Sequence, residues 1–122
     1  MNILITSNIN DEKYTPYVLN MYKTYLDADE FERYYSFKNK HRQMAFLIAR
    51  GELKSKLGGI LHKDPYDVKI RYNSNGKPYI NDDIFFSISH TGDLIGVIIS
   101  SKPVGIEIKK KKNRDFSKIS RK

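Results

Sequence analysis

The sequence predicts an α+β fold in which helices pack on one face of an antiparallel sheet. After a short strand candidate at residues 3–7, apolar side chains in the first half recur at the three- and four-residue spacing of amphipathic helices. From Asp67 onwards apolar and polar residues alternate, which is the pattern of half-buried strands. A run of helices followed by a run of strands is typical of the α+β class.

The first two helices are predicted from their start signals. Asp11 or Thr15, with Pro16 following, marks the first start, because a side-chain oxygen can accept a free backbone N–H and proline suits the first helical turn. Asp27 or Asp29 marks a second start, ahead of the segment EFERYYSF.

A longer helix is expected from about Lys40 to Leu57. Gly58 and Gly59 follow it and are predicted to act as its C-cap residues. Apolar residues inside it fall on one continuous stripe at helical spacing. The stripe consists of Phe46, Ala49, Leu53, Leu57 and Leu61.

The second half is expected to form strands separated by turn residues. Asn75 and Gly76 form a dipeptide that is typical of a tight turn between two strands. The expected strands are DVKIRY (67–72), KPYI (77–80), FFSISHT (85–91), LIGVIIS (94–100) and VGIEI (104–108).

Composition limits the class of protein. The 122 residues have the length of one domain, and the net charge is +8. Residues 109–122 hold eight Lys/Arg and one Asp, whereas residues 1–108 carry a net charge of only +1. A basic end can bind phosphate backbones, but it is more often a solvated, mobile terminus, and no nucleic-acid recognition motif accompanies it. Nucleic acid is therefore not the expected partner.

The absence of cysteine excludes a disulfide framework and a thiolate metal site. The three histidines, His41, His62 and His90, are too scattered for the ligand spacing of a zinc site. No apolar run has the length of a membrane span, and the N-terminus lacks the features of a signal peptide. The sequence thus predicts a cytoplasmic protein with no membrane association.

The segment NSNGKP, residues 73–78, has two interpretations. It is typical of a hairpin turn, in which Gly76 supplies a positive φ and Pro78 begins a strand. Lys77 would also lie where backbone N–H groups are free, which suits a phosphate or a purine edge. The segment is not a Walker loop, because the GxxxxGK[ST] pattern does not occur.

The segment SISH, residues 87–90, places Phe86, Ile88 and His90 on one strand face and the serines on the other. Ser89 and His90 therefore cannot form a nucleophile and base pair, because adjacent strand residues point to opposite faces. His90 is left at a strand end beside Thr-Gly-Asp, where it can donate to its own turn or to a phosphate.

The segment GIEI places Glu107 and Lys109 on one face of a strand and Ile106 and Ile108 on the other. An exposed ion pair of small value is one interpretation. A magnesium site is the other, because one carboxylate together with phosphate oxygens can hold this cation. Arg33, in DEFERYY, has the position of an ordinary solvated helix charge.

Taken in order, these stretches resemble the N-terminal half of the Sfp-type 4′-phosphopantetheinyl transferases. That family's pattern runs from a helical Arg/Lys through F…R…AR..LR, GKP, N-[IL]-SH and G-[IV]-D-[IV]-E. The resemblance covers about residues 28–110. The residues that carry it are Arg33, Phe37, Arg42, FLIAR ending at Arg50, Lys54, NGKP, FSISH and GIEI.

The resemblance implies a fold, an activity and partners. The chain is expected to be a single lobe of the 4′-phosphopantetheinyl transferase fold. In that family the phosphopantetheine arm of coenzyme A is transferred to a serine of an acyl or peptidyl carrier protein. Coenzyme A is then the substrate, Mg²⁺ the cofactor and a carrier protein the partner.

The resemblance also implies site residues. Arg33 is expected to contact a phosphate of coenzyme A, and Ser89 and His90 are expected to hold its phosphates. The nucleotide would be bordered by Gly76, Lys77 and Pro78. Glu107 falls where the family has its metal-binding Asp, so it is the predicted metal ligand.

The chain also departs from the family pattern. Ser87 replaces the usual Asn, and Lys109 stands where many members have a second acid. We expect Lys109 to pair with Glu107 and to weaken Mg²⁺ binding.

Residues 1–110 are predicted to be the N-terminal lobe, and residues 111–122 a basic tail at the start of a linker to a missing second lobe. The catalytic base is expected in that second lobe, so the chain would be a truncated lobe. It would then work as a homodimer or with a complementing chain. The alternative is a non-catalytic module that binds coenzyme A or carrier protein.

Overall fold

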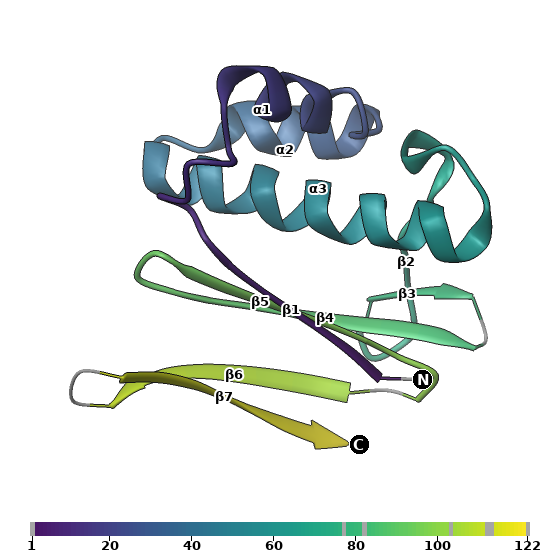
Figure 1. Ribbon diagram of the computed structural model, residues 1–122. Helices are drawn as coiled ribbons and strands as arrows, with labels where there is room; N and C mark the ends of the chain where they lie inside the picture. The colour runs from purple at the N-terminus through teal and green to yellow at the C-terminus, as the bar shows by residue number, and fades with distance from the viewer. Residues whose placement is uncertain (1, 77, 82, 103, 112–113, 122) are drawn as a thin grey trace. The chain divides into compact units, whose positions relative to one another are not determined.

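The computed structural model describes residues 2–76, 78–81, 83–102, 104–111 and 114–121, with side chains up to Lys102. The chain folds into two compact units. One contains residues Ile9–Val68, and the other contains Met1–Asn8 with Lys69–Lys122. The first unit is helical and the second is built of strands (Figure 1).

The helical unit contains α1 (Pro16–Lys23), α2 (Ala28–Ser36), α3 (Lys40–Leu61) and the short 3₁₀ helix η1 (Pro65–Asp67). Of the predicted start residues, Thr15 caps α1 and Asp27 caps α2. The Thr15 side chain accepts a hydrogen bond from the Val18 N–H at 3.2 Å. Asp27 and Glu30 form a reciprocal capping box, which satisfies two N–H groups at the start of α2.

The predicted end of the long helix was wrong. Helix α3 continues through Gly58 and Gly59 to Leu61, and the capping residue is His62, in the left-handed region with φ 55°. Gly58 serves packing instead of termination, because a Cβ there would lie 2.8 Å from the Lys63 carbonyl oxygen. The Lys63 N–H donates to the Gly58 carbonyl at 2.9 Å and closes the last turn.

Helix α3 lies at the centre of its unit and contacts both α1 and α2. Ala49, Leu53 and Leu57 are buried as the stripe predicts. Burial extends further around the helix than one stripe, because α1 and α2 cover another face. Residues buried beyond the stripe are Ala45, Leu47, Ile48, Arg50, Gly51, Lys54 and Gly58.

The second unit contains a five-stranded antiparallel sheet with the order β1-β5-β4-β3-β2. Strand β5 lies between β1 and β4 and is buried on both faces from Ile95 to Ser100. The strand bounds are β1 (Asn2–Asn8), β2 (Arg71–Tyr72), β3 (Pro78–Asn81), β4 (Ile84–Thr91) and β5 (Leu94–Ser100).

The expected strand at 67–72 is mostly absent, since only Arg71 and Tyr72 pair as β2. Asp64 explains the difference: its side chain accepts the Tyr66 N–H at 2.9 Å and starts η1. Asp67 therefore belongs to a helical turn.

Strands β6 (Val104–Lys111) and β7 (Arg114–Arg121) pair with each other in a separate two-stranded sheet. The expected strand GIEI is therefore confirmed. The segment predicted as a basic tail contains β7, whose backbone is paired with β6 and is not a free terminus. The lobe boundary at residue 110 and the linker role of residues 111–122 stay predictions.

The predicted α+β class is confirmed, with helices α1 to α3 and an antiparallel sheet among the described residues. No helix in this part of the chain is long and apolar enough to cross a membrane.

Candidate functional site

The turn between β2 and β3 has the geometry predicted for NSNGKP. Gly76 has a φ of 79°, which favours glycine, and its N–H donates to the Asn73 carbonyl at 2.9 Å. The Asn73 side chain accepts the Asn75 N–H at 2.9 Å and tightens the turn further. Pro78 follows as the first residue of β3 and is the register partner of Tyr72. Lys77 lies outside the described residues.

Ser89 and His90 lie near the end of β4, where they pair with Gly96 and Ile95 of β5. Ser89 is half-buried and His90 is exposed. The turn to β5 follows at once and contains Gly92 with a φ of 56°. His90 is therefore at the strand end, as predicted.

The GKP turn and the Ser89–His90 pair belong to the same sheet but lie at different points along it. Tyr79, the residue after Pro78, pairs with Phe85 of β4. Because β3 runs antiparallel to β4, Pro78 and the turn before it lie on the side of this pair that is toward Ser89. Pro78 is therefore about three residues, or roughly 10 Å at the usual strand rise, from Ser89 along the strands.

Glu107 is in β6, and its register partner is Lys118 of β7. The backbone of β6 also approaches β4 and β5, with Cα atoms within 8 Å. This brings the strand that carries the predicted metal ligand close to the strand that carries Ser89 and His90. The side chains of Glu107 and Lys109 lie outside the described part of the chain, so their predicted pairing stays a prediction.

Arg33 belongs to the helical unit, on α2, whereas the strand residues predicted to act with it belong to the other unit. Its side chain is exposed. The guanidinium carbon lies 5.2 Å from the centre of the Phe46 ring of α3, a cation–π distance. The Arg50 guanidinium carbon lies at the same distance from this ring, but Arg50 is buried, with 8% exposure.

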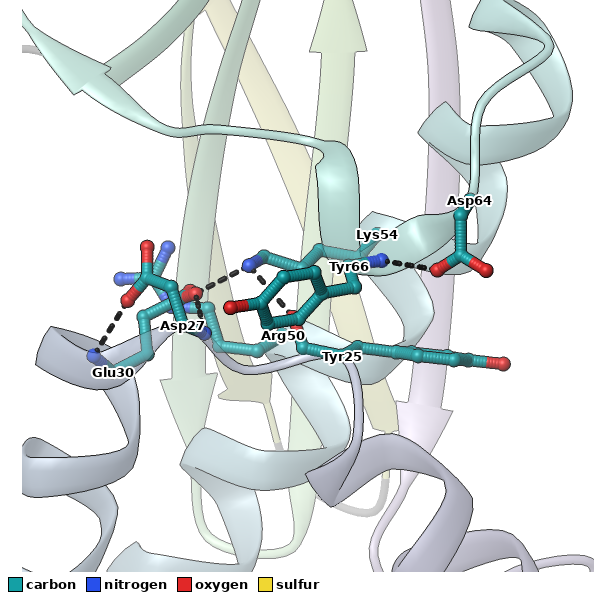
Figure 2. A network of polar contacts seen from close by, with 7 residues as sticks. All are labelled: Tyr25, Asp27, Glu30, Arg50, Lys54, Asp64 and Tyr66. Carbon is teal, nitrogen blue, oxygen red and sulfur yellow. Dashed lines mark hydrogen bonds and ion pairs between the residues drawn. The ribbon is translucent and has the colours of Figure 1, made fainter.

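A buried polar network links α3 to α2 and to the loop before it (Figure 2). The Lys54 ammonium is fully buried and donates to Glu30 Oε1 and, at 3.0 Å, to the Tyr25 carbonyl. Glu30 Oε1 also accepts the Asp27 N–H at 3.1 Å. Arg50 Nε lies 3.6 Å from the other carboxylate oxygen, Oε2. One carboxylate thus faces two buried cations.

From the sequence, Arg50 and Lys54 were named as residues of the family pattern only, and Glu30 was not singled out. A signal was present, because Arg50 and Lys54 are charges four residues apart inside the apolar segment FLIARGELKSKL. Buried charges need partners, and an acid at the start of a preceding helix is a suitable one.

A second polar cluster joins the segment before α1 to α3. The Tyr14 hydroxyl donates to Glu52 Oε1 at 2.5 Å, and the Lys13 ammonium lies 3.2 Å from the same oxygen. The hydrogen bond to Glu52 raises the pKa of Lys13. Burial raises the pKa of Tyr22, whose ring packs on Gly51.

Metal-binding side chains do not cluster in the described residues, where no three His, Asp or Glu side chains come together. The predicted magnesium site depends on Glu107, whose side chain lies outside that part.

Comparison with curated proteins places the chain among relatives of transferase enzymes. The 4′-phosphopantetheinyl transferase HetI of Nostoc sp. is 33% identical over 89 residues, which are 68% of this chain and 38% of that protein. The 4′-phosphopantetheinyl transferase gsp of Aneurinibacillus migulanus is 32% identical over 80 residues, 66% of this chain and 32% of that protein. A Bacillus subtilis 4′-phosphopantetheinyl transferase is 33% identical over 86 residues, which are 69% of this chain and 37% of that protein.

The chain is therefore a relative of the 4′-phosphopantetheinyl transferases, and the predicted resemblance is confirmed. It spans about a third of the length of these curated relatives. No protein-family model matches it.

Proposed function

We propose that this chain is part of a 4′-phosphopantetheinyl transferase, which transfers the phosphopantetheine arm of coenzyme A to a serine of an acyl or peptidyl carrier protein. The similarity to three curated transferases of this name is the observation that carries the proposal. The arrangement of Pro78 and Ser89–His90 on neighbouring strands of one sheet supports it, because the two segments lie within roughly 10 Å of each other along the strands and both can contact one ligand. The cytoplasmic location is part of the same proposal.

The proposed roles follow the chemistry of the side chains. Coenzyme A carries phosphate groups, so its binding requires cations and N–H donors. Lys77 and Arg33 supply the cations, and His90 at an exposed strand end supplies a ring N–H. The turn at Gly76 lets the backbone approach the nucleotide closely, because no Cβ stands there.

The residues fit a magnesium ion only in part. Glu107 is the single carboxylate in β6, Lys109 is two residues away and Lys118 is the register partner. Two basic positions beside one acid do not make a strong cation site. When bound, Mg²⁺ would offset the charge of the pyrophosphate.

We further propose that transfer requires a second lobe, which supplies the catalytic base. The matched segments make up only 32–38% of the curated relatives, which leaves room in those proteins for such a lobe.

The alternative is a non-catalytic module that binds coenzyme A or carrier protein. The lysine at position 109 favours it, since it bears on metal binding and does not remove the proposed phosphate-binding residues.

Mass spectrometry separates the two functions. An apo carrier protein is incubated with coenzyme A, Mg²⁺ and this chain, and coenzyme A binding is measured in parallel by calorimetry. A mass increase of one phosphopantetheine on the carrier supports transfer. Binding without a mass increase supports the module. If neither a mass increase nor binding is observed, the proposed function is left without support.

A further inference from the structure

We propose that Phe46 is a positioning residue for Arg33, holding the guanidinium of this exposed arginine on α2 in place for a phosphate of coenzyme A. The inference rests on the proposed function for the identity of the ligand. The geometry that carries it is the 5.2 Å distance between the Arg33 guanidinium and the Phe46 ring, which joins α2 to α3.

Arg33 and Arg50 contact the same ring but differ in access to solvent. Arg50 is 8% exposed, its Nε lies 3.6 Å from Glu30 Oε2, and its Nη1 is buried with no hydrogen-bond partner among the described residues. A ligand cannot reach Arg50 unless the helices separate. Arg33 is exposed, so it can bind a ligand while its guanidinium stays over the ring.

Positioning matters because an exposed arginine samples many rotamers. Ordering such a side chain on binding lowers affinity, and an aromatic surface beneath the guanidinium removes part of that penalty in advance. Stacking leaves the N–H edge of the guanidinium available, and that edge is the part that donates to phosphate oxygens.

Neighbouring contacts fix the position of the Phe46 ring and of helix α2. Phe37, which follows α2, lies 5.4 Å from the Phe46 ring. Glu30, one helical turn before Arg33, is bound by the buried Lys54 of α3. The Phe46 ring contacts Arg50 of the buried network, and helix α2, which carries Arg33, contributes Glu30 to it. Both are therefore attached to the same network.

The test is a double-mutant cycle on coenzyme A affinity, measured by calorimetry, with Arg33→Ala and Phe46→Leu. Phe46→Leu is expected to weaken binding about two- to fivefold, the range of an exposed cation–π contact. In the Arg33→Ala background Phe46→Leu should have no further effect, because the group that it positions is gone. Phe46→Tyr retains a ring and should bind like the wild type.

Tyr35→Leu is the matched control, because it removes an exposed aromatic ring of α2 that packs on Phe31 and Tyr34 and leaves the ring near Arg33 in place. It is expected to bind coenzyme A like the wild type. Equal losses for Phe46→Leu with and without Arg33, or an unchanged affinity in Phe46→Leu, would overturn the inference and leave the proposed function standing.

If the wild type does not bind coenzyme A, the proposed function fails, and the stacking itself is tested by NMR. The Arg33 side-chain N–H resonance should be shifted by the Phe46 ring current in the wild type and in Phe46→Tyr, but not in Phe46→Leu. The same resonance position in all three proteins overturns the positioning role.

Discussion

The ammonium of Lys54 on α3 is fully buried and donates a hydrogen bond to Glu30 on α2. Because the carboxylate also accepts the Asp27 N–H and faces Arg50, it compensates two buried cations and completes a helix cap. Loss of the acid and loss of the lysine should therefore have unequal effects on the helical unit.

Glu30→Ala is expected to lower the free energy of unfolding by about 3–5 kcal/mol, since it leaves buried cations without a counter-charge. Lys54→Met should have a smaller effect, because the acid keeps Arg50 as a partner and the new side chain is apolar and of similar length. Denaturant unfolding measures the free energy of unfolding of both variants. Glu32→Ala, an exposed acid on the same helix, is the control, and equal losses at positions 30 and 54 would contradict the unequal roles.

Two glycines inside α3 should respond oppositely to the same substitution. A Cβ on Gly51 would overlap the Tyr22 ring of α1, so Gly51→Ala is expected to destabilise by about 1–3 kcal/mol or more. A Cβ on Gly59 meets nothing within 4 Å, so Gly59→Ala should stabilise by about 0.5–1 kcal/mol through helix propensity. Thermal unfolding of the two variants decides between this packing and a loose contact of α1 with α3.

Stability should fall as the pH rises above about 10, in part because of Tyr22. Burial raises the pKa of this phenol above the ordinary value of 10.0, so the folded state keeps the proton that the unfolded state releases. The contribution is fully present below pH 10 and is lost as the pH rises toward the folded pKa. Tyr22→Phe should show a shallower alkaline loss in denaturant unfolding, whereas Tyr17→Phe, at a position with 78% exposure, should retain the wild-type slope.

Coenzyme A affinity tests the proposed phosphate contacts on the strands. Lys77→Ala should weaken binding by about 1.5–3 kcal/mol, as expected for the loss of a charge-assisted hydrogen bond. Lys56→Ala, an exposed lysine on α3, is the control in the same calorimetric titration. Unchanged affinity in the double variant Lys77→Ala/His90→Ala would mean that the GKP and SISH segments only form turns and do not bind the phosphates.

The sequence predicted the features that depend on neighbouring residues. Thr15 and Asp27 cap helices through bonds to residues three positions away, and the turn at Gly76 closes within four residues. The Glu30–Lys54 pair could not be found in this way, because its members are 24 positions apart and each alone has the character of a solvated charge. Burial by the neighbouring helices decides the role of such residues.

The same limit explains the errors at segment ends. Glycine is typical of a helix end, so Gly58 was expected to terminate the helix. Its role is instead set by the close approach of the Lys63 carbonyl oxygen, which depends on the folded structure. The basic residues 111–122 indicated a free terminus, yet Arg114–Arg121 among them pair with β6 as β7. Of the candidate site, the local conformations at Gly76 and His90 could be predicted, whereas the roles of these residues toward a ligand stay predictions.

The magnesium site gives the last test. We expect weak Mg²⁺ dependence in the wild type, because Glu107 is the single acid of β6 and Lys109 shares its strand face by alternation. Glu107 with the two basic residues Lys109 and Lys118 gives a formal charge of +1, and Lys109→Glu changes this charge to −1. Lys109→Glu should therefore strengthen the Mg²⁺ dependence of coenzyme A binding in calorimetry with and without the metal. Lys110→Glu adds the same charge on the opposite strand face and is the matched control. An equal response of both variants would mean that net charge alone attracts the ion, and no response in either would leave Glu107 as a polar strand residue.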